Sequence, residues 1–305
     1  MERISLEGQV AIVTGGGAGL GRAYSLELAR RGAAVVVNDV VAEAADGVVG
    51  EIEAAGGRAV AVHATVATVE GGREIVDAAV SAFGTVDAIV NNAGIMRPGF
   101  FEDLDPALLD QHFAVHAGGA FYVTQPAWPI MKEKGYGRVV MISSAGGLFT
   151  MQANSVYGVA KGAIFSLGRA LALEGQEHGI RVNSVLPNAD TDMGRNHPVP
   201  GYEKHFREEL RTKLAPMRVA EGVAPLVAYL ASPACTVTGE AFSSTCGRVA
   251  QVFVGVTEGW VGDHRSMTAE EIAENLDQIR DRSEYSVPAS LWEEYEVIGR
   301  TLGVA

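Results

Sequence analysis

The segment Thr14-Gly15-Gly16-Gly17-Ala18-Gly19-Leu20-Gly21 lies between an apolar run and a helical pattern. Its first glycine permits a sharp turn out of a strand, Gly19 lets the backbone approach a pyrophosphate, and Gly21 lets the helix pack on a sheet. The free N–H groups and the positive dipole at the start of the helix then favour phosphate. The residues assigned to this dinucleotide-binding turn are Gly15, Gly17, Gly19, Leu20 and Gly21.

The same alternation of apolar run and helical pattern continues to about residue 246. The predicted strands are Gln9–Thr14, Ala33–Asn38, Ala59–His63, Val86–Asn91, Arg138–Ser143 and Arg181–Leu186. The predicted helices are Leu20–Arg31, Val41–Ala55, Gly71–Phe83, Pro106–Lys134 and Val156–His178, the fourth bent near Gly118 or Pro126. Apolar strands that each precede a helix indicate a parallel sheet covered on both faces. The sequence therefore predicts an α/β, doubly wound Rossmann-type domain over residues 1–246.

The remainder of the chain follows a different pattern. Residues 189–215 mix prolines, glycine and charges, and we expect a loop with a short helix that forms a substrate lid. Residues 247–305 are predicted as a C-terminal extension with a strand at Val249–Val256 and a helix at Thr268–Arg280 that opens with a capping box. The tail after this helix is expected to be weakly ordered at best.

Composition narrows the class of protein. Of 305 residues, 48% are hydrophobic and 20% charged, which excludes global disorder. The net charge of −13 argues against binding to nucleic acid or an anionic membrane surface. Two cysteines, Cys235 and Cys246, make neither a disulfide framework nor a metal-ligand set, so no metal is predicted. No secretory signal, no membrane span and no peroxisomal address at Gly303-Val304-Ala305 is visible, so a cytoplasmic location is expected.

Asp39 indicates which dinucleotide binds. It closes the second predicted strand, 24 residues after Gly15, where a carboxylate can bind both ribose hydroxyls. The same carboxylate repels a 2′-phosphate, so NAD is favoured over NADP. Arg22, which directly follows Gly21, is a cation that would favour NADP instead.

Three residues form a catalytic pattern. Tyr157 and Lys161 are four residues apart on one predicted helix, so both face the same side. Ser144 follows the fifth predicted strand, at the sheet edge where ligands bind. A nearby cation favours a phenolate, so we expect Tyr157 to have a lowered pKa and to exchange a proton with a substrate hydroxyl. Ser144 would hydrogen-bond the oxygen that reacts.

Taken together, Thr14-Gly15, Gly19-x-Gly21, Asn91-Asn92-Ala93-Gly94, Ser144 and Tyr157-x-x-x-Lys161 resemble the short-chain dehydrogenase/reductase family. The resemblance implies that Asn92, Ala93 and Gly94 line the adenosine ribose, and that Lys161 also binds the nicotinamide ribose. It further implies contacts from Pro187, Asn188 and Thr191 to the nicotinamide end. At adenine the family often has Asp before Val; this sequence has Thr65-Val66, which changes that hydrogen bond, although the Val66 N–H could still serve.

His116 stands where the family has a catalytic asparagine. It could substitute in a proton relay or could simply pack, and the sequence leaves both open. Val37-Asn38-Asp39, Val115-His116 and Pro187-Asn188-Ala189 resemble one subgroup, the dehydrogenase units of type 2 peroxisomal multifunctional enzymes, also called type 4 17β-hydroxysteroid dehydrogenases. That resemblance implies oxidation of (3R)-3-hydroxyacyl-CoA to 3-ketoacyl-CoA with NAD, or of a 17β-hydroxysteroid.

The expected lid bears on the substrate. Residues 189–218 hold six basic and five acidic residues, a local charge of +1 in a chain of −13. These cations could hold CoA phosphates, although an ordinary solvated helix has the same composition. The apolar candidates for an acyl chain or a sterol are Met96, Leu148, Phe149, Met151 and Met193. An NAD(H)-binding regulatory protein, or a lyase or epimerase on the same fold, remains an alternative.

The helix after Tyr157 is apolar nearly all round, from Gly162 to Ala172. Such a helix is buried on more than one side, and a single domain offers the sheet on one side only. We therefore expect a homodimer or homotetramer packed through this helix and the long helix before it.

Overall fold

The computed structural model describes residues 3–201, 204 and 207–304. Within these residues the chain divides into two compact units, Met1–Gln251 and Val252–Ala305, which are described separately. The expected lid, residues 189–215, includes four positions, 202, 203, 205 and 206, that lie outside the described residues. The proposed boundary at residue 246 and the lid itself remain predictions.

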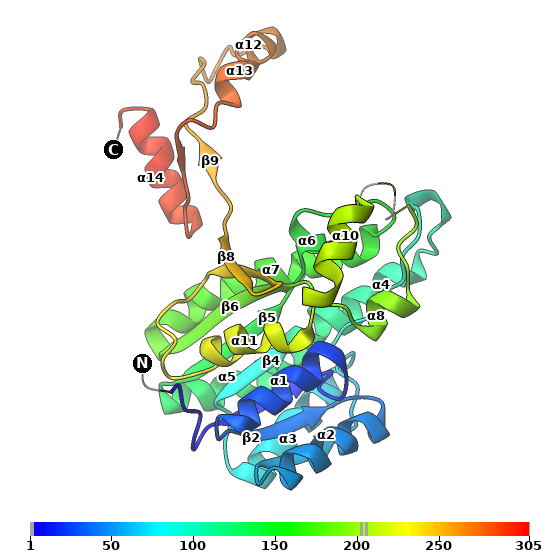
Figure 1. The fold of residues 1–305 in the computed structure, drawn as a ribbon. Helices are drawn as coiled ribbons and strands as arrows, with labels where there is room; N and C mark the ends of the chain where they lie inside the picture. Colours follow the sequence, from blue (N-terminus) through cyan, green and yellow to red (C-terminus); the bar gives the residue numbers. More distant parts are fainter. Residues whose placement is uncertain (1–2, 202–203, 205–206, 305) are drawn as a thin grey trace. The chain divides into compact units, whose positions relative to one another are not determined.

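The first unit is built on an eight-stranded sheet, with the strand order β3-β2-β1-β4-β5-β6-β7-β8 (Figure 1). Its strands are β1 (Val10–Thr14), β2 (Ala34–Asn38), β3 (Arg58–Val62), β4 (Ala88–Asn91), β5 (Gly137–Ile142), β6 (Ile180–Pro187), β7 (Ala241–Thr245) and β8 (Arg248–Val252). Strands β1 to β7 pair in parallel. The order reverses between β1 and β4, which is the point where doubly wound sheets bind ligands.

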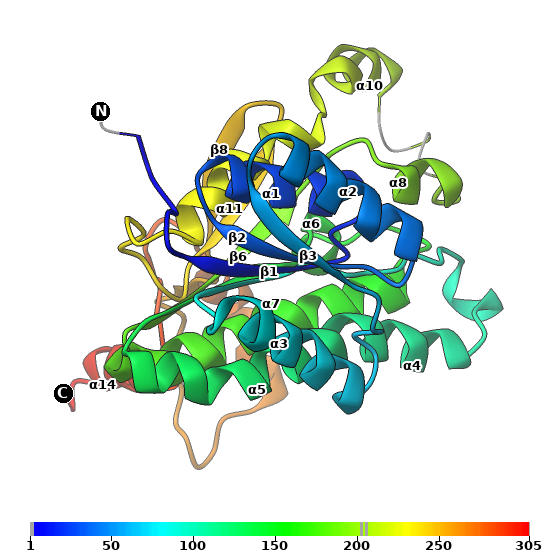
Figure 2. The same cartoon turned by 90° about the horizontal axis from the view of Figure 1, so that it is seen from below.

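Helices cover both faces of this sheet. Figure 2 shows α1, α2 and α11 on one face and α3, α4, α5 and α7 on the other. The helices of the unit are α1 (Gly19–Arg30), α2 (Ala42–Ala54), α3 (Val69–Phe83), α4 (Ala107–Phe113), α5 (Gly119–Lys134), α6 (Ala145–Leu148), α7 (Ser155–Gly175), α8 (Asp192–Asn196), α10 (Glu208–Leu214) and α11 (Ala224–Leu230). Short 3-10 turns lie at Phe101–Asp103, Gln176–His178, Ala215–Met217 and Ala220–Gly222. The doubly wound α/β prediction is confirmed.

Two hydrophobic clusters form the core, one on each face of the sheet. Adjacent residues of β1 belong to different clusters: Val13 packs with Tyr24 and Leu28 of α1, whereas Ile12 packs with Ile75 of α3 and Ile164 of α7. Because successive side chains of a strand point to opposite faces, an uninterrupted apolar run supplies both clusters. Each such fully buried side chain contributes about 1.5–3 kcal/mol.

The long helix predicted over Pro106–Lys134 is interrupted. A π-helical turn, Ala114–Gly118, separates α4 from α5. This turn contains Gly118, one of the positions near which a bend is expected; the bend itself stays a prediction. One buried residue of the turn is His116, which contacts Ile95 in the loop after β4.

No segment of the sequence is expected to have the length and composition of a membrane span, but helix α7 meets these two criteria. Among the described residues, Ser155–His178 is long and apolar enough to cross a membrane by length and composition alone. Its Ile164 and Ala172 belong to the core cluster, and the helix packs along β6. These contacts are those of a core helix.

In the second unit, β9 (Val256–Thr257) pairs antiparallel with β10 (Tyr285–Ser286). The single strand predicted over Val249–Val256 is therefore wrong, because the chain leaves strand geometry between β8 and β9. The capping box is present, with Thr268 and Glu271 each bonding the other's backbone. The helix that it opens is split into α12 (Ala269–Glu274) and α13 (Leu276–Ile279).

The tail is more ordered than expected. Leu291–Thr301 forms the helix α14, and the Ser290 side chain caps it by accepting a hydrogen bond from the Glu293 N–H at 3.2 Å. The Glu293 carboxylate in turn accepts one from the Ala289 N–H at 2.8 Å. Reciprocal capping of this kind stabilises the first turn of a helix, which explains why the prediction of weak order is wrong.

Candidate active site

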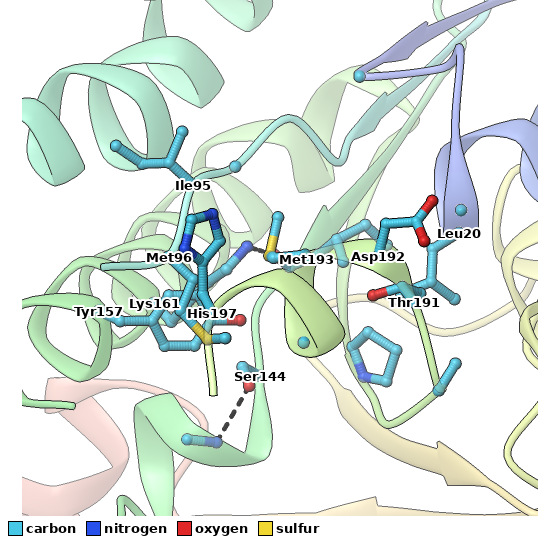
Figure 3. A pocket seen from close by; sticks show the side chains of 18 of the residues that line it. Leu20, Ile95, Met96, Ser144, Tyr157, Lys161, Thr191, Asp192, Met193 and His197 are labelled. Atoms are coloured by element: carbon cyan, nitrogen blue, oxygen red, sulfur yellow. Dashed lines mark hydrogen bonds between the residues drawn. The ribbon is translucent and has the colours of Figure 1, made fainter. Parts of the chain in front are cut away.

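A cavity of about 1080 Å³ lies at the carboxyl ends of the central strands. Residues that follow β1, β4, β5 and β6 line it, together with residues of α7 and α8. Figure 3 shows Ser144, Tyr157 and Lys161 facing this space, with Thr191 and Met193 of the segment after β6 beside it. The cavity therefore occupies the position at which parallel sheets bind their ligands.

The glycine turn after β1 forms one wall of the cavity. Gly15 and Gly19 have positive φ angles of 60° and 51°, a conformation that other residues rarely adopt. A Cβ on Gly21 would lie 1.9 Å from the carbonyl oxygen of Gly15, so only glycine allows the helix to start this close to the strand. The Asn92 side chain locks the turn by donating to the carbonyl oxygens of Thr14 and Gly15 at 2.9 and 3.0 Å. The backbone is thus shaped to receive a diphosphate.

Asp39 stands at the end of β2, on the same wall. Its carboxylate accepts hydrogen bonds from the N–H groups of Gly17 at 3.1 Å and Val41 at 3.0 Å. Arg22, the opposing signal, points away from it: its guanidinium pairs with Glu51 at 3.0 and 2.5 Å. No cation among the described residues pairs with Asp39, so this end of the cavity fits ribose hydroxyls better than a second phosphate.

The structure brings most of the predicted cofactor residues together. Those that line the cavity are Gly15, Gly19, Leu20, Gly21, Asp39, Thr65, Val66, Asn92, Ala93, Gly94, Tyr157, Lys161, Pro187, Asn188 and Thr191. Gly17 does not line it. A Cβ on Gly17 would lie 2.8 Å from Ala44, so this glycine serves the packing of α2 and holds Asp39 through its N–H.

Ser144, Tyr157 and Lys161 share the opposite wall. Ser144 starts α6, and its Oγ accepts a hydrogen bond from the Gly146 N–H at 3.0 Å. Lys161 is 4% exposed; its Nζ donates to the Ile142 carbonyl at 2.8 Å and lies 5.8 Å from the centre of the Tyr157 ring. The helix α7 and the end of β5 together fix all three side chains.

The protonation of this group differs from the sequence expectation. Burial raises the pKa of Tyr157, and its hydrogen bond with Ser144 lowers it by less. Burial also lowers the pKa of Lys161 to about 7. The expected lowering of the tyrosine pKa is therefore wrong for this state of the site, because removal from water weakens the charged form of both partners.

His116 is buried, with 1% of its surface exposed, and it does not line the cavity. Its Nε2 lies 2.8 Å from the carbonyl oxygen and 3.2 Å from the amide nitrogen of Ile95, so it holds the loop after β4. Its ring meets the Tyr157 ring edge-on at 5.5 Å. A Cβ on Gly94 would lie 2.5 Å from His116 Cε1, so this glycine makes room for the ring. Burial, and then the charge of Lys161, lower the pKa of His116 well below its usual value.

The predicted substrate residues separate into two sets. Met96, Met151 and Met193 line the cavity, whereas Leu148 and Phe149 do not. Phe149 is 65% exposed where α6 ends, so the turn of that short helix directs it away from the cavity.

Figure 1 shows α8 and α10 at the same end of the sheet as α6 and α4. Three basic residues of this region, Lys204, Arg211 and Arg218, line the cavity. Arg195 also lines it and pairs with Asp190 and Asp192 at 2.8 and 2.9 Å. Arg218 donates to the Asn188 Oδ1 at 3.1 Å.

Sequence reasoning missed some of the lining residues. Asn154, three residues before Tyr157, lines the cavity with a fully buried amide. Its position at a helix start was the available signal, but that pattern normally indicates a cap. His197 also lines the cavity, 2.9 Å from an Arg97 nitrogen that lies 100 residues away in the chain, and no local pattern indicates that contact.

Comparison with known proteins agrees with this geometry. A family model described as short chain dehydrogenase matches residues 9–198. The chain is 37% identical to peroxisomal multifunctional enzyme type 2 of Mus musculus, over 95% of the chain and 39% of that enzyme. It is also 37% identical to a short-chain type dehydrogenase/reductase of Mycobacterium tuberculosis, over 91% of the chain and 96% of that protein. The chain thus spans about two fifths of the length of the mouse enzyme.

Solved structures give the same result. Full-length peroxisomal multifunctional enzyme type 2 from Drosophila melanogaster is similar with a TM-score of 0.80 and 30% identity, over 98% of this chain and 50% of that one. A 3-ketoacyl-(acyl-carrier-protein) reductase from Brucella melitensis, complexed with NADH, is similar with a TM-score of 0.70 and 31% identity, over 78% of this chain and 97% of that one. The chain therefore belongs to the short-chain dehydrogenase family, as an NAD(H)-dependent oxidoreductase that acts on CH–OH groups.

Proposed function

We propose that the chain oxidises the 3-hydroxyl group of (3R)-3-hydroxyacyl-CoA to the 3-ketone. The observation that carries the proposal is that Ser144, Tyr157 and Lys161 share one cavity with the glycine turn and Asp39. The similarity to peroxisomal multifunctional enzymes supports this choice of substrate. Because the chain spans only part of those enzymes, the substrate remains a proposal.

In the proposed mechanism, Tyr157 accepts the proton of the substrate hydroxyl as general base. Bound NAD supplies the acceptor for the hydride. The Ser144 Oγ accepts from the Gly146 N–H and is hydrogen-bonded to the Tyr157 side chain. In the proposed mechanism the substrate oxygen takes the place of the phenol oxygen as the acceptor of the Ser144 hydrogen. Lys161, when protonated, favours the phenolate through its charge, 5.8 Å from the ring centre. The same side chain is the proposed ligand of the nicotinamide ribose.

We assign His116 a positioning role in this mechanism. A proton relay needs contact with the cavity, and His116 lies behind Tyr157 rather than at the cavity wall. Its hydrogen bond to Ile95 and its edge contact with the Tyr157 ring both restrict where the phenol can lie. This favours packing over the relay left open by the sequence.

The remaining cofactor contacts follow the family pattern. Asp39 is proposed to bind the adenosine ribose hydroxyls, with Asn92, Ala93 and Gly94 beside that ribose. Thr65 and Val66 are assigned to adenine. The three residues assigned to the nicotinamide end are Pro187, Asn188 and Thr191, and all of these residues line the cavity.

The two ends of the substrate would meet different surfaces. Lys204, Arg211 and Arg218 offer positive charge to the phosphates of CoA. Met96, Met151 and Met193 offer an adaptable apolar wall to the acyl chain. The same methionines suit a sterol, so a 17β-hydroxysteroid is the second candidate substrate.

A spectrophotometric assay of NAD reduction tests the proposal. It compares (R)- and (S)-3-hydroxyacyl-CoA of several chain lengths with 17β-hydroxysteroids. The expected result is a preference for the (R)-thioesters. Preference for the steroids would support the second candidate, and NADH binding without turnover of any alcohol would support a regulatory protein instead.

We further infer a homodimer or homotetramer. Apolar side chains remain exposed on the long helices, including Phe121 of α5 at 42% and Val159 and Leu173 of α7 at 52% and 50%. Burial of such a surface between copies would remove apolar area from water. Sedimentation as a clean 32.0 kDa monomer would contradict this inference.

For the location we propose a reducing, cytoplasmic compartment. Cys235 and Cys246 are both free thiols, which supports a reducing environment. The peroxisomal names of two similar proteins make the peroxisome the alternative. Microscopy of the tagged full chain distinguishes a diffuse signal from an organelle.

A further inference from the structure

Asn154 is a buried amide that binds nothing in the described part of the chain. It occupies the N-cap of α7, and only 3% of its surface is exposed. Asparagine at an N-cap normally accepts a hydrogen bond from the first turn of the helix, yet this side chain makes no such bond. Both its Nδ2 and its Oδ1 lack a partner among the described residues. Buried polar atoms without a partner are uncommon in folded proteins and need an explanation, and for a side chain that lines a cavity a ligand is such an explanation.

The backbone holds Asn154 in this position from both sides. Its carbonyl oxygen accepts from the Gly158 N–H at 2.9 Å within α7. The preceding Ala153 has a φ of 55°, a left-handed conformation that is costly for alanine, and its carbonyl accepts from the Gly99 N–H at 2.9 Å. Two separate segments therefore fix where the amide lies. A side chain that is placed with this much constraint and left without a partner is suited to a ligand.

The amide lies beside the reacting groups. Asn154 lines the same cavity as Ser144 and Tyr157. A Cβ on Gly146 would lie 3.4 Å from Ser144 Oγ, 3.5 Å from Tyr157 Cε1 and 3.7 Å from Asn154 Nδ2. The three side chains therefore surround one point, and the glycine keeps that space open.

We propose that Asn154 is a specificity-determining residue whose amide N–H donates a hydrogen bond to the thioester carbonyl of the substrate. The inference rests on the proposed function, because the oxygen that Asn154 would bind belongs to the thioester. A 3-hydroxyacyl-CoA carries this carbonyl oxygen in addition to the hydroxyl oxygen that reacts. In that substrate the carbonyl carbon is two carbon–carbon bonds, about 2.5 Å, from the carbon that is oxidised. Ser144 and Tyr157 bind the reacting oxygen, and Asn154 binds the other. A 17β-hydroxysteroid carries no carbonyl at that distance from its hydroxyl group and would leave the amide unpaired.

The test compares two substrates that differ only in this carbonyl. One is (3R)-3-hydroxybutyryl-CoA, and the other is the thioether S-(3R-hydroxybutyl)-CoA, in which a methylene group replaces the carbonyl. The variants are Asn154→Leu, which keeps the shape and removes both polar atoms, and Asn154→Asp, which removes the N–H donors. The control is Ser155→Ala, because the Ser155 Oγ is also buried and without a described partner but does not line the cavity.

We expect both Asn154 variants to lower the ratio of kcat/KM for thioester over thioether by about 10-fold to 100-fold. We expect the Ser155 control to leave this ratio within about 3-fold. The melting temperature of Asn154→Leu should equal or exceed that of the wild type, since two unpaired buried atoms are removed. The affinity for NADH, measured by fluorescence, should not change.

Other outcomes overturn the proposal. Equal loss of activity on both substrates, or a lower melting temperature with an unchanged ratio, would give Asn154 a structural role only. A wild-type enzyme that prefers the thioether to the thioester would refute the carbonyl contact while leaving the oxidation of a hydroxyacyl substrate intact. A wild-type enzyme that oxidises no (3R)-3-hydroxyacyl-CoA, at any of the chain lengths in the assay above, would refute the proposed function, and the thioester contact with it.

Discussion

Gly94→Ala is a single-methyl change that tests how the site holds its tyrosine. The added Cβ would lie 2.5 Å from His116 Cε1 and 3.1 Å from His116 Nδ1. Carbon atoms in contact prefer about 3.5–4.0 Å, so the imidazole must move by about 1 Å. It cannot move this far and keep both short contacts with Ile95, at 2.8 and 3.2 Å. The ring would also leave its edge contact with Tyr157.

The magnitude follows from these contacts. Overpacking a dense core costs about 1–3 kcal/mol, and a lost hydrogen bond about 0.5–1.5 kcal/mol, which together lower the free energy of unfolding by about 1.5–4.5 kcal/mol. A displacement of about 1 Å at a catalytic group can lower the rate about 100-fold. Urea denaturation measures the first effect, and steady-state NAD reduction measures the second.

The control is a double-mutant cycle with His116→Ala. Removing the imidazole leaves space for the new methyl group, so Gly94→Ala should cost less than about 0.5 kcal/mol in that background. Unfolding is the correct readout for the cycle, because Gly94 is also a proposed cofactor contact. If Gly94→Ala destabilises the protein equally with and without His116, the reasoning that links the two residues is wrong.

Three further changes test the rest of the site. Tyr157→Phe should lower kcat by about 10²-fold to 10⁴-fold, the usual contribution of a general base, while NADH binding stays nearly unchanged in a fluorescence titration; retained turnover would contradict the assigned base. Because burial lowers the pKa of Lys161 from 10.5 to about 7, the folded protein binds fewer protons than the unfolded chain between these values, so this residue makes stability rise with pH there. In urea denaturation, the free energy of unfolding of Lys161→Met should therefore exceed that of the wild type most below pH 7, and the difference should decline toward pH 10.5. A difference that does not change with pH would be incompatible with the burial effect. Asp39→Asn should raise the use of NADP relative to NAD by about 10-fold or more, since it removes a charge that repels a 2′-phosphate, although its single oxygen can replace only one of the two acceptors that Gly17 and Val41 now use; an unchanged kcat/KM ratio would mean that another group selects the cofactor.

The strands of the central sheet were predictable because their physical cause is local. Val35-Val36-Val37 in β2 is buried on both faces, and an apolar run of β-branched residues is typical of that environment. β7 was not predicted. Its sequence, Ala241-Phe-Ser-Ser-Thr245, has few apolar side chains, and it is a strand because it pairs with β6. That pairing depends on a contact across more than 50 residues, which no window of sequence contains.

The candidate site divides in the same way. Ser144, Tyr157 and Lys161 were identifiable because residue type, spacing and position after a strand agree. The direction of the tyrosine pKa was not, because it depends on the burial of Tyr157 and Lys161, and spacing carries no information on burial. Asn154 was not predicted for a related reason. An asparagine at a helix start is expected to cap the helix, and the sequence does not show that this side chain makes no cap hydrogen bond.

The π-turn at Ala114–Gly118 has a consequence for how this region tolerates change. A π-turn contains one residue more than the α-helical turn it replaces, so it shifts the angular position of everything after it by about 100°. Within the turn, His116 faces Ile95; after the turn, Ala120 and Val123 face the core. Deleting a single residue would restore a regular helix and turn one of these two faces away from its partners. Length in this segment is therefore more tightly constrained than identity, and a scan of single-residue deletions and insertions should disrupt the site more than any scan of substitutions.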